Sequence, residues 1–313
     1  MGTAVQVGVE SVAHGTVAGS FISVPCDFAA VLNQQNKVLD EDRQGQDRHY
    51  AMQKGASVQE FEVGESGIYH DTIGYWLRAA MGTPVSTAAE VTAFDNVFKF
   101  ADDPNSLSLK WQQPRRYTQA YQSLYAVVDE MEFSFEAEGD LAYTLKGLAQ
   151  AETEVAQITH SFTDTVPMPA WAGTVTLGGG ANTRLVRGKV GFKRNRKPFY
   201  TIRNEQSPKS MSAGARTVEF ELTLDFDSKA EYDDFKAATN DSLLITWVDA
   251  TTTIGSTLNP EFEITLGTIA YESGEIDTGE DYPLVTLSGK ALYDSSDASL
   301  AVIRVQSDVD YEA

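Results

Sequence analysis

The sequence has one cysteine, few basic residues and no long apolar stretch, and each shortage excludes a class of protein. Cys26 is the only cysteine, which excludes an intrachain disulfide and a zinc site built from several cysteines. Lysine and arginine number 24 against 45 aspartates and glutamates, so the formal net charge is −21. A surface this acidic repels phosphate, which disfavours a protein that reads DNA or RNA sequence. The apolar runs are a few residues long, far short of a membrane span.

The N-terminus lacks the pattern of an exported protein. Residues 1–5 show no basic patch followed by an apolar stretch, so we expect no signal peptide and a soluble protein made in a reducing compartment. Core-forming residues are plentiful, because 42% of the 313 residues are hydrophobic. That content excludes a wholly disordered chain, and the length suits two domains or one large one.

Alternating apolar and polar residues predict a mainly β protein. From Val218 to Phe226, apolar residues occupy every second position and mostly acidic residues lie between them, as in a strand with one wet face. Met131 to Glu136 follow the same rule. Further β-rich runs, separated by turn-forming residues, cover residues 107–111, 243–247 and 284–287.

Two helices interrupt the predicted strands. Apolar residues from Tyr69 to Met81 recur at helical spacing, and Gly82 is suited to ending that helix. The second predicted helix runs from Ser228 to Asn240 and opens with Ser228 and Glu231 at the spacing of a capping box.

The order of these elements repeats along the chain. Each half contains a strand, a helix, a strand that ends in tryptophan (Trp111 or Trp247), and paired strands that end in Thr-Leu-x-Gly at residues 144–147 or 286–289. We interpret this as a duplicated β-sandwich or barrel domain with one flanking helix per copy, the alternative being chance agreement among β-rich segments. The predicted parts are an N-terminal arm that orders only against a partner (1–20), a first domain (21–165) with a long loop (83–97), and a second domain (166–313).

Charge is unevenly distributed in the second half. The stretch from Arg184 to Lys197 has no acidic residue, whereas the last part of the chain is strongly acidic. Blocks of opposite sign can meet on neighbouring copies and orient assembly, or each can be a solvated face. The candidate inter-subunit basic block consists of Arg184, Arg187, Lys189, Lys193, Arg194, Arg196 and Lys197.

No pattern of catalytic or ligand-binding residues stands out. The four histidines lie at no metal-ligand spacing from one another or from Cys26, and Gly178 to Gly180 lack the Lys-Ser/Thr of a phosphate loop. Glu132 and Glu136 are better explained as part of a solvent-exposed strand face than as the pair of catalytic carboxylates of a glycosidase. We therefore predict no enzyme, no catalytic residue, no metal and no cofactor.

The whole pattern resembles the major tail tube protein of long-tailed, siphovirus-type bacteriophages. The resemblance rests on architecture and on residues 128–135, 141–147, 188–193 and 218–247. It implies a structural virion protein whose sheets join those of neighbours into an inner barrel, in rings that stack into a tube through a long loop and a terminal arm. A duplicated chain would form trimeric, pseudo-sixfold rings.

The resemblance also implies the partners and the location. The chain would bind itself and meet tail terminator, tape-measure and baseplate proteins, with no membrane contact. It would be made in the host cytoplasm and reside in the virion tail. DNA would pass through an acidic channel without specific binding, since carboxylates repel phosphate. The candidate channel-lining residues are Glu132, Glu136, Glu219, Glu221 and Asp225, for which an outer solvent face is the alternative.

Three rival functions are left open. One is another virion component, such as a decoration or tail-terminator protein. A second is a carbohydrate-binding β-sandwich module, which would need exposed aromatic residues clustered on one face to stack on sugars. An enzyme is the third.

Overall fold

The computed structural model describes residues 3–10, 14–40, 49–112, 119–277 and 283–312. Within them the chain is mainly β, with one large antiparallel sheet, a two-stranded ribbon and two α-helices, which confirms the predicted fold class. The first-half elements are β1 (Thr3–Val9), β2 (Ile22–Asp40), β3 (His49–Gly67), α1 (Ile73–Ala80), β4 (Val85–Glu90), β5 (Ala93–Lys99), β6 (Leu107–Trp111), β7 (Ala120–Glu136), β8 (Ala142–Ala149) and β9 (Thr153–Val155). The remaining elements are the short 3-10 helix η1 (Ala170–Ala172), β10 (Gly173–Leu177), β11 (Gly180–Asn182), β12 (Leu185–Lys193), β13 (Lys197–Phe199), β14 (Ser210–Ser212), β15 (Thr217–Asp225), α2 (Ala230–Ala237), β16 (Asp241–Val248), β17 (Glu261–Asp277), β18 (Leu284–Leu292) and β19 (Val302–Ser307).

The first half forms a closed barrel. Its strands pair in the cycle β1–β2–β3–β8–β7–β6 and back to β1. Closure is possible because β2 and β7 are long enough to take part in both walls. β7 changes direction near Tyr125, which has a φ of 51°, and carries a bulge between Val128 and Glu130.

The second half repeats this order of pairing. Its strands follow the series β10–β16–β17–β18–β15–β12, and α2 follows β15 as α1 follows β3. β17 has a bulge between Tyr271 and Ser273, at the place that corresponds to the bulge of β7. The agreement in pairing supports the interpretation of a duplicated domain.

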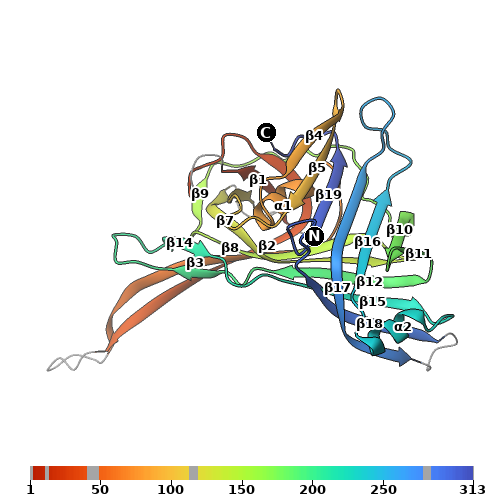
Figure 1. Cartoon of the computed structure of the whole chain (residues 1–313). Coiled ribbons are helices and arrows are strands. Elements are labelled where there is room, and N and C mark those ends of the chain that lie inside the picture. The colour runs from red at the N-terminus through yellow and green to blue at the C-terminus, as the bar shows by residue number, and fades with distance from the viewer. Residues whose placement is uncertain (1–2, 11–13, 41–48, 113–118, 278–282, 313) are drawn as a thin grey trace.

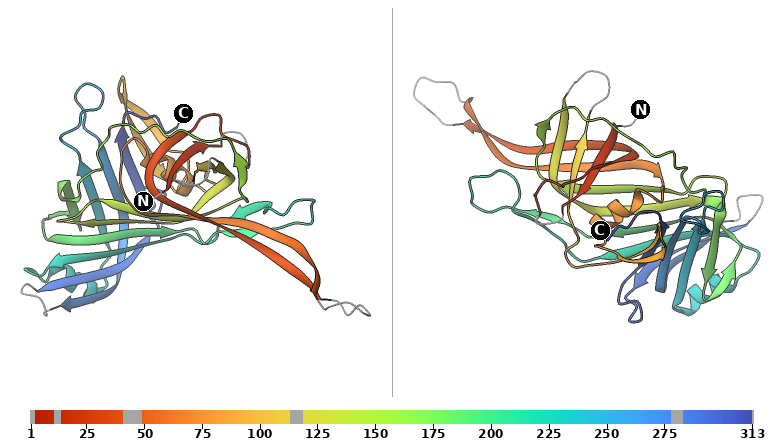
Figure 2. Two further views of the ribbon diagram at one scale, coloured as in Figure 1. Left: turned by 180° about the vertical axis from the view of Figure 1, so that it is seen from behind. Right: turned by 90° about the horizontal axis from the view of Figure 1, so that it is seen from above.

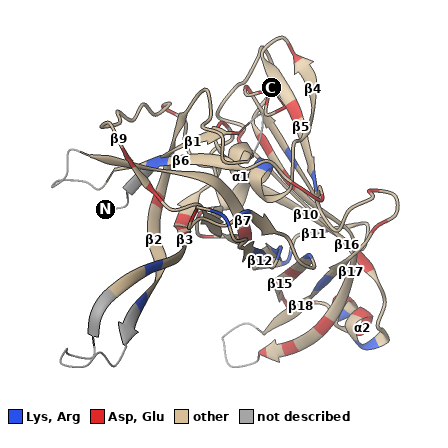
Figure 3. Ribbon diagram, turned by 90° about the vertical axis from the view of Figure 1, so that its left-hand side faces the viewer, with Lys and Arg blue, Asp and Glu red and all other residues tan. Residues whose placement is uncertain are grey.

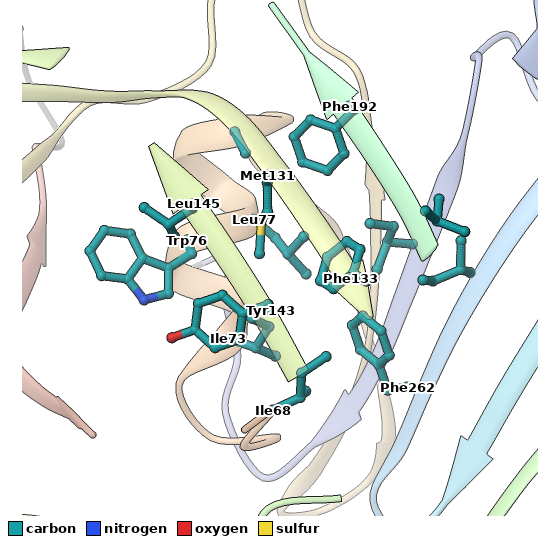
Figure 4. Packing of buried hydrophobic residues seen from close by; sticks show 14 of the residues in the cluster. Ile68, Ile73, Trp76, Leu77, Met131, Phe133, Tyr143, Leu145, Phe192 and Phe262 are labelled. Atoms are coloured by element: carbon teal, nitrogen blue, oxygen red, sulfur yellow. The ribbon is translucent and has the colours of Figure 1, made fainter. Parts of the chain in front are cut away.

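The two halves share one continuous sheet. β7 of the first half pairs with β12 of the second, so eight strands run side by side in the order β2–β3–β8–β7–β12–β15–β18–β17. One face of this sheet is apolar and packs against α1 and the strands of the second layer (Figure 4). The buried residues drawn there include Trp76 of α1, Phe133 of β7, Tyr143 of β8 and Phe192 of β12. The other face is exposed and charged.

The C-terminal segment ties the halves together a second time. β19 lies between β17 of the second half and β5 of the first (Figure 1). Beyond β19, the buried Tyr311 donates a 2.7 Å hydrogen bond from its hydroxyl to the carbonyl of His70, and its ring lies against Gly74 of α1. The fold of the first half therefore depends on residues at the far end of the chain.

Several local predictions need correction. Residues 83–97, predicted to be a long loop, mostly form the hairpin β4–β5, which is held in the sheet by β19. The predicted arm 1–20 includes β1, where alternating valines bury Val5 and Val7 and pair with β2 and β6. Both helices are shorter than predicted, and Glu231 does not complete a capping box because its carboxylate pairs with Arg184. Ser228 does accept a hydrogen bond from the backbone N–H of Ala230.

The most prominent projection is the β2–β3 ribbon. It extends well beyond the body of the molecule (Figures 1 and 2). Val31 and Met52 on this ribbon are 60% and 66% exposed. The connection between β13 and β14 projects on the same side, and the carbonyl of Gln206 accepts a 3.0 Å hydrogen bond from the backbone N–H of Ser57.

Candidate assembly and channel surface

The charged face of the eight-stranded sheet is hollowed. Its shallow depression lies over β8, β7, β12, β15 and β18, and its wall includes Glu132, Lys189 and Glu221. Alternation along each strand places these side chains on this face, while their neighbours in sequence enter the core. A concave face on a twisted sheet is the side that becomes the interior when such a sheet closes into a barrel.

Charges on this face are arranged in strips of alternating sign. β7 and β15 present carboxylates, and β12 between them presents basic residues (Figure 3). The ammonium groups of Lys189 and Lys193 lie 3.8 Å and 3.6 Å from the carboxylates of Glu132 and Glu130. Carboxylates outnumber basic groups: Glu60, Glu62, Glu130, Glu132, Glu136, Glu219, Glu221, Asp225, Glu272, Glu275 and Asp277 against Lys146, Arg187, Lys189, Lys193 and Lys290.

All five predicted channel-lining residues occur on this face. Glu132 and Glu136 lie on β7, and Glu219, Glu221 and Asp225 on β15, with β12 between the two strands. All five are exposed in the single chain. They therefore form one surface, although they come from two halves of the sequence.

Both lateral edges of the eight-stranded sheet are open. Among the described residues, β2 beyond Phe28 pairs only with β3, and β17 from Ala270 to Ile276 pairs only with β18. Each edge presents unpaired backbone N–H and C=O groups, which invite pairing with another strand. An arc with two open edges is a shape suited to ring closure by further copies.

A comparison with family models agrees with this geometry. The model described as phage tail tube protein matches residues 2–291. The chain belongs to the phage tail tube protein family. No curated protein sequence gives a significant match. The family is structural, so this member is a component of the phage tail.

The predicted basic block of this tail tube protein divides into two groups. Arg187, Lys189 and Lys193 extend onto the charged face from β12. Arg194 is completely buried and donates to the carbonyls of Ala80, at the end of α1, and Ala101, at 2.7 Å and 2.6 Å.

Arg196 and Arg184 also make contacts within the chain. Arg196 donates to the carbonyls of Val128 and Met211, at 3.0 Å and 3.1 Å. Arg184 pairs with Glu231 of α2. Arg184, Arg194 and Arg196 thus join parts of one molecule, whereas an inter-subunit role for Arg187, Lys189, Lys193 and Lys197 stays a prediction.

Burial changes the acid–base behaviour of the buried arginines without neutralising them. Burial lowers the pKa of Arg194 to about 10, with the charges of Arg196 and Arg216 acting in the same direction. Arg194 therefore keeps its charge at neutral pH and holds the carbonyls of the first half through charged hydrogen bonds. Burial likewise lowers the pKa of Arg196.

Sequence reasoning missed the other charged residues of the face. Lys146 and Lys290 flank the glycines of the two Thr-Leu-x-Gly motifs, and Lys290 lies 2.7 Å from the carboxylate of Glu272. Alternation around each motif is the signal that could have found them. Their opposition to Glu130 and Glu219 follows from strand pairing, which no local pattern specifies.

The described part of the chain offers little for ligand chemistry. Within it, no group of three or more histidine, cysteine, aspartate or glutamate side chains is placed to hold a metal ion. Burial raises the pKa of Cys26 to about 12, so its thiol is a poor nucleophile. No helix of the described residues is long and apolar enough to cross a membrane.

Proposed function

We propose that three copies of this chain close a ring around a channel and that such rings stack into the tail tube. The observation that carries the proposal is the continuous eight-stranded sheet with a concave charged face and two open edges. Three such arcs supply the strands of one closed barrel, with each chain acting as two pseudo-equivalent domains. The proposed domains remain those of the sequence, residues 21–165 and 166–313, with β1 added to the first barrel.

The expected dimensions suit passage of a duplex. Twenty-four strands spaced about 4.8 Å apart and tilted by about 40° give a backbone barrel about 48 Å across. Side chains that point inward leave a channel of roughly 35–40 Å. Duplex DNA, about 20 Å wide, passes through such a channel without touching its wall.

The charges of the concave face suit a channel that does not bind DNA. Carboxylates predominate, and Lys189, Lys193 and Lys290 lie close to Glu132, Glu130 and Glu272. A basic side chain that is already paired with a carboxylate attracts a phosphate only weakly. Contact with DNA therefore releases few counterions and adds little binding affinity. The wall therefore lets DNA slide during ejection.

The β2–β3 ribbon is the proposed bridge between stacked rings. It projects from the body, and both faces of its outer part are exposed. This role was predicted for residues 83–97 and for the N-terminal arm, but the hairpin β4–β5 and strand β1 are held within the sheet. At the two ends of the tube, the expected partners are the tail terminator on one side and baseplate proteins on the other, with tape-measure protein in the lumen.

Electron microscopy of the concentrated purified chain, combined with charge reversal of Glu219 and Glu221 to lysine, tests the proposal. We expect hollow tubes from the parent chain and from the variant, because both residues lie away from the open edges. Phage that carry the variant are expected to eject DNA more slowly than the parent phage, and the difference in ejection rate should grow as the salt concentration falls. Tubes that fail to form, with normal ejection from surviving particles, would contradict the channel assignment.

A further inference from the structure

The strand pairings align the two halves residue by residue. Leu145 and Leu287 occupy the same place in the two Thr-Leu-x-Gly motifs, and they lie opposite Met131 on β7 and Gly274 on β17. The bulges that follow fall at the same step, between residues 128 and 130 and between residues 271 and 273. Met131 therefore corresponds to Gly274, and β7 corresponds to β17 without a shift.

The same reasoning aligns β2 with β12. Phe61 and Phe220 lie opposite the motif glycines Gly147 and Gly289. Across the next pair of strands, Phe61 lies opposite Ala30 of β2, and Phe220 lies opposite Val190 of β12. Ala30 therefore corresponds to Val190, and Leu32 to Phe192.

The junction between the halves is a template for a second junction. β7 pairs with β12 antiparallel, with Met131 opposite Phe192 and Phe133 opposite Val190. β17 and β2 are the counterparts of these strands, and they carry the two open edges of the sheet. The missing pair in the repeat is thus β17 with β2, which lie at opposite ends of one chain and can meet only between two molecules.

We propose that β17 of one chain pairs antiparallel with β2 of a second copy in the register of the β7–β12 junction. Gly274 then lies opposite Leu32, Glu275 opposite Val31, and Ile276 opposite Ala30. This inference rests on the proposed ring and adds to it the specific strand pair, its register and the residues that meet.

The side chains at the two edges fit this pairing on the core side. Leu32 is 39% exposed in the single chain, whereas its counterpart Phe192 is 3% exposed and packs on Phe133. Gly274 has no side chain, so the ring of Phe235 of α2 packs directly against the backbone of β17, and this ring is only half-buried. In the proposed pairing the leucine of the second copy lies over the half-buried aromatic ring, burying apolar surface on both chains.

On the channel side the two junctions differ in charge. The ion pairs Lys189–Glu132 and Lys193–Glu130 cross the junction within the chain. The corresponding pairs between copies are Ala29 with Glu275 and Asn33 with Ser273, neither of which can form a salt bridge. The junction between copies therefore lacks the ion pairs of the junction within the chain, and we expect that moderate salt does not weaken ring formation.

Disulfide trapping tests the register. In a Cys26→Ser background, the pair Val31→Cys with Glu275→Cys places two thiols opposite each other, within the reach of a disulfide. The matched control, Val31→Cys with Ser273→Cys, moves one thiol two residues along β17, about 7–8 Å from its partner. After mild oxidation of assembled protein, non-reducing gels should show dimers and closed trimers for the first pair and mainly monomers for the control.

A second pair of variants does not depend on oxidation. Val31 is 60% exposed and lies opposite Glu60 of β3, so in a Glu60→Gln background Val31→Glu and Val31→Lys should fold equally well. In the proposed register the new glutamate faces Glu275 and the new lysine pairs with it. We expect the glutamate variant to need about fivefold more protein to assemble than the lysine variant at low salt.

The outcomes separate the register from the proposed function. Rings or tubes in which the control pair cross-links, or in which neither pair does, overturn the register and leave the ring intact. Equal assembly of the glutamate and lysine variants also contradicts it. A Cys26→Ser chain that stays monomeric at every concentration instead contradicts the proposed function itself.

Discussion

The glycines of the two Thr-Leu-x-Gly motifs yield the sharpest stability prediction. A Cβ atom added at Gly147 would lie inside the contact distance of the Phe61 ring and the backbone oxygen of Val127. One added at Gly289 would lie 2.9 Å from the ring of Phe220 and closer still to the backbone oxygen of Ala270. The close neighbours correspond in the two halves, so both substitutions test the same packing.

The size of the expected loss of stability depends on which atoms near the added Cβ atom can shift. An aromatic ring can shift by a few tenths of an ångström, but a paired backbone oxygen in the middle of a sheet cannot. We therefore expect Gly147→Ala and Gly289→Ala each to lower the free energy of unfolding by about 2–3 kcal/mol, the upper range for overpacking. Gly191→Ala is the matched control, because its nearest atoms lie 3.7 Å away on the open face of the same sheet.

Urea unfolding followed by tryptophan fluorescence measures the effect. The free energy of unfolding of the Gly191→Ala control should equal that of the parent or exceed it by up to about 1 kcal/mol, since alanine restricts the unfolded chain more than glycine does. If Gly147→Ala and Gly289→Ala unfold at the parent's urea midpoint, the close approach of ring and backbone in both halves is wrong. If all three variants are equally destabilised, the effect belongs to glycine in strands generally and says nothing about the repeat.

Three further predictions concern buried polar groups. Tyr311→Phe removes a 2.7 Å hydrogen bond and should lower the free energy of unfolding by about 1–2 kcal/mol, whereas Tyr293→Phe, at an exposed tyrosine, should leave the urea midpoint unchanged. Arg194→Ala leaves the buried carbonyls of two first-half segments without their donor and should lower the free energy of unfolding by at least about 3 kcal/mol. Arg187→Ala, on the exposed face, should lower it by less than about 0.5 kcal/mol. Equal urea midpoints for the two variants would show that the hydrogen bonds of Arg194 do not hold the two halves together. Burial raises the pKa of Cys26 to about 12, so Ellman's reagent at pH 8 should react at least about 100-fold more slowly with folded than with urea-unfolded protein. The raised pKa also means that the thiol's contribution to stability is present below pH 9 and is lost as pH rises toward 12.

Strong local periodicity accounts for what the sequence predicts well. β6 was predicted with its observed bounds, and the alternation from Val218 to Phe226 lies on β15 within one residue at each end. In these strands every second residue is apolar and buried, so burial and pattern agree. The same alternation identified five residues of the charged face before their strands could be placed side by side.

Elements without that pattern were missed. The hairpin β4–β5 is rich in alanine and threonine and mostly exposed on β4, so its strands are set by pairing with β19 from the far end of the chain. β1 is short, and its position is likewise set by tertiary pairing, because it pairs with β2 on one side and with β6 on the other. Tertiary pairing decided both segments, and local sequence carries little of that information.

The arginines near the end of β12 show a different limit. A count of charges treats Arg187 and Arg194 alike, yet one lies on the exposed face and the other is buried against carbonyls of the first half. Which arginine becomes buried depends on where the end of α1 falls relative to β12. That geometry arises only once the two halves share a sheet.

The most direct test of the central claim is a cryo-electron microscopy reconstruction of tubes assembled from the purified chain. We expect threefold rings with a continuous barrel of about 24 strands, an open channel of roughly 35–40 Å, and Glu132, Glu219 and Glu221 facing its axis. Tubes in which these carboxylates face outward, or in which β17 and β2 of adjacent chains are not neighbours, would contradict it.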